Sequence, residues 1–323
     1  MTSLPNGAGR VMTVAGPTDP EALGHTVTSV HLVNAVHLVN DLNGAPAPLT
    51  MDRLGALALD SPDEADLRLS AEDVRADLAD FAERGGGAVV EVTGTDLGRR
   101  APELARLSRE TGVAVVMGSA SGTAEELVRD LTEGVDGVRA GLIGKIGPLD
   151  LDQAADRAVA LAVADAARRT GAPVLVERAA TAAATHTLID LLTEGGADPG
   201  RIAVGHCDGL AADVDALAEL AGRGVFVQFD ELGRLPTVYR EVDDQDVAAA
   251  VLALAGRGHA ERILLSPRVS QKIGLKGYGG VGYGFVAQQF VPFLQFQGTD
   301  DALLRTLTAA NPSRWLTFTE ARG

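Results

Sequence analysis

Residues 138–177 read VRAGLIGKIGPLDLDQAADRAVALAVADAARRTGAPVLVE, and this stretch decides the expected fold. Two short apolar runs, Val138–Ile146 and Pro173–Glu177, flank a segment, Leu151–Thr170, whose apolar residues recur at three- and four-residue spacing. That spacing predicts an amphipathic helix, and apolar runs without alternation predict strands buried on both faces of a parallel sheet. The stretch therefore predicts a strand, a helix that stops at Gly171, and a second strand.

The same pattern repeats along the whole chain. The expected strands are His25–Leu32, Ala88–Thr93, Val113–Met117, Val138–Ile146, Pro173–Glu177, Ile202–His206, Val225–Phe229 and Ile263–Ser266. The expected helices are Ala71–Arg84, Ala101–Thr111, Thr123–Thr132, Leu151–Thr170, Thr187–Glu194, Ala211–Ala221 and Asp244–Ala255. Several helices are expected to begin at a capping residue, such as Ser70 or Asp244, and to stop at a glycine, such as Gly112.

Eight strands that alternate with helices favour an α/β fold of the (β/α)₈ TIM-barrel type over a doubly wound sheet. We expect residues 1–323 to form a single barrel domain with a helical C-terminal tail at Gly284–Leu294 and Asp300–Ala310. Long connections at Val33–Pro62, Gly233–Glu241 and Val269–Tyr283 follow strands one, seven and eight. In a barrel such loops cover the catalytic mouth, so a lid or specificity element is expected there.

The composition excludes several classes of partner. The formal net charge is −16 at pH 7, which argues against nucleic acid or an anionic membrane because both attract clustered Lys and Arg. The single cysteine, Cys207, cannot form an intrachain disulfide. Neither a signal peptide nor an apolar run long enough to span a membrane is recognisable, so a cytoplasmic location is expected.

Polar or charged residues stand at the ends of several expected strands. They are His31, Lys145, Glu177, His206 and Arg268. In a β/α barrel, the chemistry lies at the C-terminal ends of the strands. These side chains are therefore the expected catalytic residues.

Several short motifs, spread over nearly the whole chain, are similar to those of one enzyme family. They are GRVMTV (9–14), LGHT (23–26), LGR (97–99), RAGLIGKIG (139–147), VGHCD (204–208), GGVGY (279–283) and NPSRWL (311–316). In order and spacing they resemble the phosphotriesterase-related branch of the amidohydrolase superfamily.

The resemblance implies a site for two divalent metals that activate a bridging water. In the family the ligands are a His-x-His pair on strand one, a carboxylated Lys or a Glu on strand four, His residues on strands five and six, and an Asp on strand eight. The matching positions here hold Ser29 and His31, Lys145, Glu177, His206 and Arg268. Only His31 and His206 keep a family histidine, while Lys145 falls where the Glu-bearing variant of the motif has its bridge.

These replacements change which metals the centre can hold. Arg268 offers no lone pair and cannot be deprotonated in a protein, so it would repel a dication. Glu177 and His206 are legitimate zinc ligands, and Lys145 would be a third if it were carboxylated. An ammonium on Lys145 would instead pair with Glu177. We therefore expect no metal or other cofactor, with a single zinc held by Glu177, His206 and Lys145 as the alternative.

A centre without metal would still be chemically capable. Lys145 and Arg268 place positive charge where the family holds its metals, and Arg268 can bind a carboxylate or phosphate bidentately. His31 and His206 are expected to titrate near neutrality. Glu177 is expected to act as a base or to hold Lys145 in place. Lys145 would itself suit the role of a general base or a Schiff-base nucleophile.

Other residues are assigned by position. Asp230, which follows strand seven together with Glu231, and Tyr278, in the glycine-rich loop after strand eight, are expected substrate contacts. Glu91, near the end of strand two, is expected to form a structural ion pair with Arg99 or Arg100. Cys207 should face away from its inward-facing neighbour His206 and be buried.

Together these features predict a metal-independent enzyme that acts on a small anionic or carbonyl-containing substrate. The expected acid–base chemistry would serve hydrolysis, elimination or cyclisation. Two alternatives remain: a mononuclear metal-dependent hydrolase of lactonase or esterase type, and a non-catalytic ligand-binding pseudoenzyme. Because members of the family often form dimers, a homodimer is expected.

Overall fold

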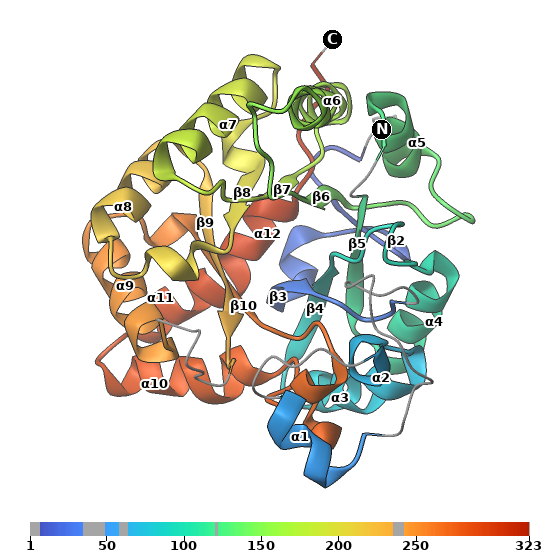
Figure 1. Cartoon of the computed structure of the whole chain (residues 1–323), viewed down its shortest axis with the longest axis vertical. Helices are drawn as coiled ribbons and strands as arrows, with labels where there is room; N and C mark the ends of the chain where they lie inside the picture. Colours follow the sequence, from blue (N-terminus) through green and yellow to red (C-terminus); the bar gives the residue numbers. More distant parts are fainter. Residues whose placement is uncertain (1–6, 35–48, 58–63, 120–121, 235–241, 323) are drawn as a thin grey trace.

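The computed structural model describes residues 7–34, 49–57, 64–119, 122–234 and 242–322. Eight strands form one parallel sheet in which spatial order follows chain order, with the helices around its outside (Figure 1). The strands are β3 (His25–Val30), β4 (Gly86–Glu91), β5 (Ala114–Ser119), β6 (Leu142–Ile146), β7 (Val174–Glu177), β8 (Ile202–Gly205), β9 (Phe226–Leu232) and β10 (Ile263–Pro267).

The first and last strands of the sheet meet and close it. The Ser266 hydroxyl donates to the carbonyl of Ser29 at 2.8 Å and accepts from the Ser29 amide at 3.0 Å. The Thr28 hydroxyl donates to the Leu265 carbonyl at 3.2 Å. The predicted (β/α)₈ barrel is thereby confirmed.

In the barrel sheet, each strand from β3 to β9 is followed by a helix that leads to the next strand. These helices are α3 (Ala71–Glu83), α4 (Ala101–Thr111), α5 (Ala124–Thr132), α6 (Ala154–Thr170), α7 (Ala182–Glu194), α8 (Val214–Gly222) and α9 (Asp244–Gly256). Two short helices, α1 (Met51–Leu57) and α2 (Glu64–Leu67), precede α3. Gly112 and Gly171 end their helices in the left-handed conformation, as expected.

The starts of α6, α7 and α8 differ from the expectation by three residues or more, and the cap of α9 is a different residue. Helix α7 begins five residues before Thr187 because the Thr181 side chain caps it, accepting from the Ala184 amide at 3.1 Å. Helix α9 is capped by Asp243 rather than Asp244, since the Asp243 carboxylate accepts from the amides of Gln245 and Asp246.

The last part of the C-terminal tail closes the N-terminal end of the barrel. The tail comprises η7 (Val286–Phe290), α10 (Val291–Phe296), α11 (Asp301–Arg305), η8 (Thr306–Ala310) and α12 (Asn311–Leu316). The indole of Trp315 is fully buried and donates to the carbonyls of Val174 (3.3 Å) and Arg201 (3.1 Å), where β7 and β8 begin. Above it the barrel is filled by apolar side chains, including Val90, Leu175 and Phe226. The candidate active site is therefore expected at the opposite end, where the strands have their C-termini.

A hairpin of β1 (Val11–Thr13) and β2 (Gly16–Thr18) precedes the barrel and was not expected from the sequence. Of the three long connections, residues 35–48, 58–62 and 235–241 lie outside the described residues. The loop 269–283 is described, and it joins the mouth where the Val269 carbonyl accepts from the His31 amide at 2.9 Å. Within the described ranges, no helix has the length and apolarity needed to cross a membrane.

Candidate active site

A cavity of about 380 Å³ lies at the C-terminal end of the barrel. The expected catalytic residues all line it: His31, Lys145, Glu177, His206 and Arg268, together with Asp230. They come from β6, β7 and β9 and from the residues that follow β3, β8 and β10. The strand-end pattern therefore identified residues that the fold does bring together.

Lys145 lies at the centre of this group. Its Nζ is 2.6 Å from Nε2 of His206, 3.0 Å from Oε1 of Glu177 and 3.3 Å from Oδ2 of Asp230. A contact between two nitrogens at this distance requires one of them to accept the hydrogen. Carboxylates of Glu177 and Asp230 flank this contact between Lys145 and His206.

The backbone of His206 is held in a conformation that is unusual for a side chain with a Cβ. Its φ is 57°, in the left-handed region, which costs about 1–2 kcal/mol for a residue other than glycine. Two contacts hold it there: its amide donates to Oδ1 of Asp230 at 2.9 Å, and its carbonyl accepts from Nε of Arg178 at 2.8 Å. Strain of this kind, at a residue lining a cavity, is typical of functional sites.

The surrounding charges determine how His206 titrates. Burial by itself lowers the pKa of His206, but hydrogen bonds and charge from Asp230 and Glu177 outweigh it and raise the pKa to about 9. The imidazole Nδ1 lies 3.0 Å from Asp230 Oδ1, and Nε2 lies 3.1 Å from Glu177 Oε1.

The two carboxylates stay ionised. Burial raises the pKa of Glu177, but His206 and Lys145 more than offset it, and the net pKa lies below the ordinary value. Burial likewise raises the pKa of the Asp230 carboxylate, yet Lys145 and His206 outweigh burial and hold this pKa well below the usual range. Glu177 therefore acts by orienting Lys145 and His206, since an ionised carboxylate with a low pKa is a poor base.

His31 has a different environment. Its Nδ1 contacts the Thr93 hydroxyl at 2.9 Å, and its carbonyl accepts from the Tyr283 hydroxyl at 2.9 Å. Burial, aided by the nearby charges of Lys145 and Arg268, lowers the pKa of His31 to about 3, so the ring is neutral. The expectation that both histidines titrate near neutrality is wrong, because carboxylates outweigh burial at His206 whereas burial dominates at His31.

Glu91 supports this side of the site in a way the sequence did not indicate. It is fully buried, and its carboxylate accepts from the backbone amides of Leu32 and, at 2.8 Å, Thr93. Burial raises its pKa to about 7. The expected ion pair with an arginine is wrong.

The two arginines considered for that pair have other partners. Arg99 donates to the Gly118 carbonyl and lies 3.4 Å from Asp130, while Arg100 pairs with Glu103. Glu91 instead fixes two backbone amides. One belongs to Leu32, which follows His31, and the other to Thr93, whose hydroxyl contacts the His31 ring.

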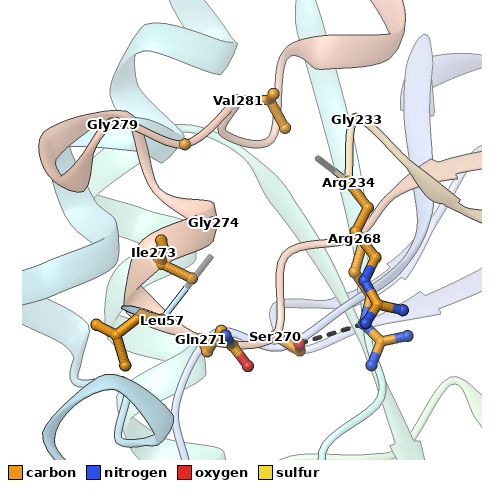
Figure 2. A pocket seen from close by; sticks show the side chains of 11 residues that line it. Leu57, Gly233, Arg234, Arg268, Ser270, Gln271, Ile273, Gly274, Gly279 and Val281 are labelled. Carbon is orange, nitrogen blue, oxygen red and sulfur yellow. Dashed lines mark hydrogen bonds between the residues drawn. The ribbon is translucent and has the colours of Figure 1, made fainter. Parts of the chain in front are cut away.

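Arg268 borders the cavity on the β10 side. One Nη donates to Glu231, and Nε donates to the Ser270 hydroxyl at 3.4 Å (Figure 2). Among the described residues none accepts a hydrogen bond from the other Nη. The side chain is 37% exposed, so the guanidinium has donors available to a bound anion.

Two expected substrate contacts are placed differently. Asp230 lines the cavity, but its oxygens already accept from Lys145, the His206 amide and Gln228 (3.2 Å), so it orients the protein's own groups. Tyr278 does not line the cavity, and its hydroxyl donates to Asp73 at 3.2 Å. It anchors the loop to α3, and substrate contact by Asp230 and Tyr278 stays a prediction.

Asp208 is a supporting residue that the sequence analysis did not single out. Its buried carboxylate accepts from the amides of Asp230 (3.0 Å) and Glu231 (3.3 Å) and so fixes the end of β9. The sequence feature that could have identified Asp208 is its position two residues after His206, within the VGHCD motif. Cys207 between them is buried, as expected.

The residues present do not fit the two divalent metals implied by the resemblance. The Lys145 amine stands between His206 and Glu177, in contact with both, and the guanidinium of Arg268 faces the same cavity. Within the described part of the chain, no three His, Cys, Asp or Glu side chains are grouped so as to hold a metal ion.

A family model decides the relationship. The model of the phosphotriesterase family matches residues 9–316. The chain belongs to the phosphotriesterase family. This confirms the resemblance, and since the family is one of enzymes, it agrees with the expected enzymatic function.

Relatives within this family match the chain over nearly its full length. The N-acetyltaurine hydrolases of Tetraodon nigroviridis and Homo sapiens are 30% and 29% identical, and each alignment covers 98% of this chain and 100% of the relative. A resiniferatoxin-binding protein from Rhodobacter sphaeroides is 35% identical, with a TM-score of 0.88 and 95% of both chains covered.

A phosphotriesterase homology protein from Escherichia coli was solved with phosphate in its active site. It is 26% identical, with a TM-score of 0.75, and the alignment covers 91% of this chain and 99% of that one.

Proposed function

We propose that this protein is a metal-independent hydrolase of a small anionic acyl compound, an amide or an ester. The observation that carries the proposal is the 2.6 Å contact between Nζ of Lys145 and Nε2 of His206, which lies beside the carboxylates of Glu177 and Asp230. Such a pair can take up and return a proton without a metal.

The reaction can be written with this chain's residues alone. When Nε2–H of a protonated His206 donates to Oε1 of Glu177, 3.1 Å away, the lone pair of a neutral Lys145 amine is free to accept a proton from water. The resulting hydroxide adds to the substrate carbonyl carbon, and the positive charges of His206 and Arg268 stabilise the oxyanion. The Lys145 ammonium then gives its proton to the leaving nitrogen or oxygen as that bond breaks. One water is consumed, and the enzyme regains its starting protons.

Several observations support an anionic acyl substrate. Arg268 has an Nη directed at no described residue and lines the same cavity as Lys145. N-acetyltaurine, the compound in the relatives' name, is an amide that carries a sulfonate, and the Escherichia coli relative holds phosphate in its active site. Of the three reaction types expected from the sequence, these names favour hydrolysis.

The test is a hydrolysis assay on protein freed of metal. Full-length protein is purified with a chelator, its metal content is measured, and it is offered N-acetyltaurine, longer N-acyl amino acids and small lactones. We expect turnover without bound metal, and a loss of about 10²–10⁴-fold in kcat for Lys145→Met.

A matched pair of histidine variants completes the test. His206→Asn keeps a residue type that tolerates the left-handed backbone but removes the imidazole, whereas His186→Asn changes a histidine of α7 that does not line the cavity. Only the first should lose activity. Activity that requires stoichiometric zinc would overturn metal independence, and tight binding without product would favour the pseudoenzyme.

A further inference from the structure

The ring of His31 has one nitrogen that is not engaged by the protein. His31 follows β3 and lines the catalytic cavity together with Lys145 and Arg268. Its Nδ1 contacts the Thr93 hydroxyl at 2.9 Å, whereas no residue in the described part of the chain forms a hydrogen bond with its Nε2. A neutral ring carries one hydrogen, so its position decides whether Nε2 donates to a bound molecule or accepts from it.

The hydrogen bonds of Thr93 decide where that hydrogen lies. The Thr93 hydroxyl is buried and donates to the carboxylate of Glu91, which also accepts from the Thr93 amide at 2.8 Å. A hydroxyl has a single hydrogen, and an ionised carboxylate is a stronger acceptor than a neutral imidazole. Toward His31 the hydroxyl therefore offers a lone pair, and Nδ1 supplies the hydrogen. Nε2 keeps its lone pair and is an acceptor toward the cavity.

The direction of this acceptor is fixed by buried groups. The His31 amide donates to the Val269 carbonyl at 2.9 Å, and the His31 carbonyl accepts from the Tyr283 hydroxyl at 2.9 Å. Glu91, Thr93 and Tyr283 are all fully buried, so water does not compete for their hydrogen bonds. An acceptor whose direction is already fixed binds a donor with little ordering cost.

The other polar groups of the cavity suit other parts of an acyl substrate. Lys145 and Arg268 are donors, which match a carbonyl oxygen and an anionic group. The carboxylates of Glu177 and Asp230 already contact the ammonium of Lys145. A secondary amide has one further polar group, its N–H, which needs an acceptor, and an ester has no such group. Nε2 of His31 offers that acceptor on the wall of the same cavity.

We propose that His31 is a specificity-determining residue whose Nε2 accepts a hydrogen bond from a substrate N–H, with Thr93 and Glu91 as the positioning residues that hold the ring in this state. The substrate is then a secondary amide that carries an anionic group, rather than an ester or a lactone. This inference rests on the proposed function and deepens it. The bond to His31 also orients the lone pair of the amide nitrogen, which accepts the proton from Lys145 as the C–N bond breaks.

Nitrogen-15 NMR of the His31 imidazole tests the position of the hydrogen on the full-length protein without any ligand. At pH 8 Glu91 is mostly ionised, because its pKa is about 7. The wild-type ring should carry its hydrogen on Nδ1. Thr93→Val keeps the shape of the side chain but leaves a hydrogen on Nδ1 without an acceptor, so the hydrogen should move to Nε2. Thr93→Ser restores the hydroxyl and should restore the wild-type signals. A wild-type ring with its hydrogen on Nε2 would overturn the inference, whether or not the protein hydrolyses anything.

The preference for an N–H is measured by binding. The probes are N-acetyltaurine and its ester counterpart, 2-acetoxyethanesulfonate, and calorimetry on full-length Lys145→Met gives their dissociation constants with turnover suppressed. The amide should bind about tenfold more tightly than the ester, which leaves Nε2 without a donor. This ratio should fall to about one when His31→Phe is added.

Asp96→Asn in the same background is the matched control, because Asp96 is an exposed carboxylate that lines the same cavity. It should keep the ratio. Equal dissociation constants, binding of neither probe, or a ratio that is lost in Asp96→Asn and kept in His31→Phe would overturn the inference. Amide-selective binding by a wild-type protein that hydrolyses neither probe would refute only the proposed function, and hydrolysis with equal dissociation constants would refute only the role of His31.

Discussion

Replacing Asp230 with asparagine should move the pH at which His206 loses its proton. Asp230 Oδ1 lies 3.0 Å from the imidazole Nδ1, and Glu177 Oε1 lies 3.1 Å from Nε2. These carboxylates favour the imidazolium, and burial opposes it. The asparagine side chain keeps the shape of the aspartate but removes one of the two negative charges.

The size of the effect follows from the pKa of His206. That pKa rises from 6.5 to about 9, a rise of about 2.5, and two carboxylates produce it against the effect of burial. Asp230 makes the larger of the two contributions, so it accounts for at least half of the rise, on the order of 2 kcal/mol. Asp230→Asn should bring the pKa of His206 to below about 8.

Nitrogen-15 NMR of the imidazole measures this directly, with His206→Asn to assign the signal. The limb of the kcat/KM profile that reports His206 should move to lower pH by the same amount. A wild-type His206 that titrates near 6.5, or an Asp230→Asn protein with an unchanged titration, would refute the reasoning.

Three further predictions concern stability and binding. The folded-state pKa of His206 lies above its unfolded value, so protonated His206 adds about 3 kcal/mol to the free energy of unfolding below pH 6.5. This stabilisation is lost as the pH rises to about 9. Urea unfolding should show the decrease in stability, and His206→Asn should make the free energy of unfolding less dependent on pH in this range. Glu91→Gln places an amide donor against two backbone amides and should lower the free energy of unfolding by about 1–3 kcal/mol, whereas Glu103→Gln, in a surface pair, should change it by less than about 0.5 kcal/mol. Arg268→Lys loses the planar pair of donors and should raise KM for anionic substrates by roughly tenfold or more, with a smaller effect on neutral ones; equal effects on both would contradict its anion-binding role.

The strands and most helix ends were predictable because they depend on local patterns. Buried parallel strands are short apolar runs, and Gly112 and Gly171 stop their helices where a left-handed residue is needed. The hairpin Val11–Thr18 escaped prediction since each of its strands has only three residues, which is too few for a period to be recognised.

The candidate site was predictable in membership but not in roles. Which residues end the strands is a property of the sequence, and so His31, Lys145 and His206 could be named. The direction of each side chain and the charges around it depend on residues from other strands. Asp230 pairs with Lys145 and accepts from the His206 amide, and Glu91 accepts from backbone amides. The sequence around Asp230 does not reveal the first of these partnerships, because Lys145 and His206 come from other parts of the chain.

The attachment of the 272–281 segment to α2 and α3 has an evolutionary consequence. Its anchors, Asp66, Asp77 and Asp80, lie on the outer helices and touch none of the proton-transferring groups. The segment can thus vary in sequence while the contacts of Lys145 with His206 and Glu177 stay in place.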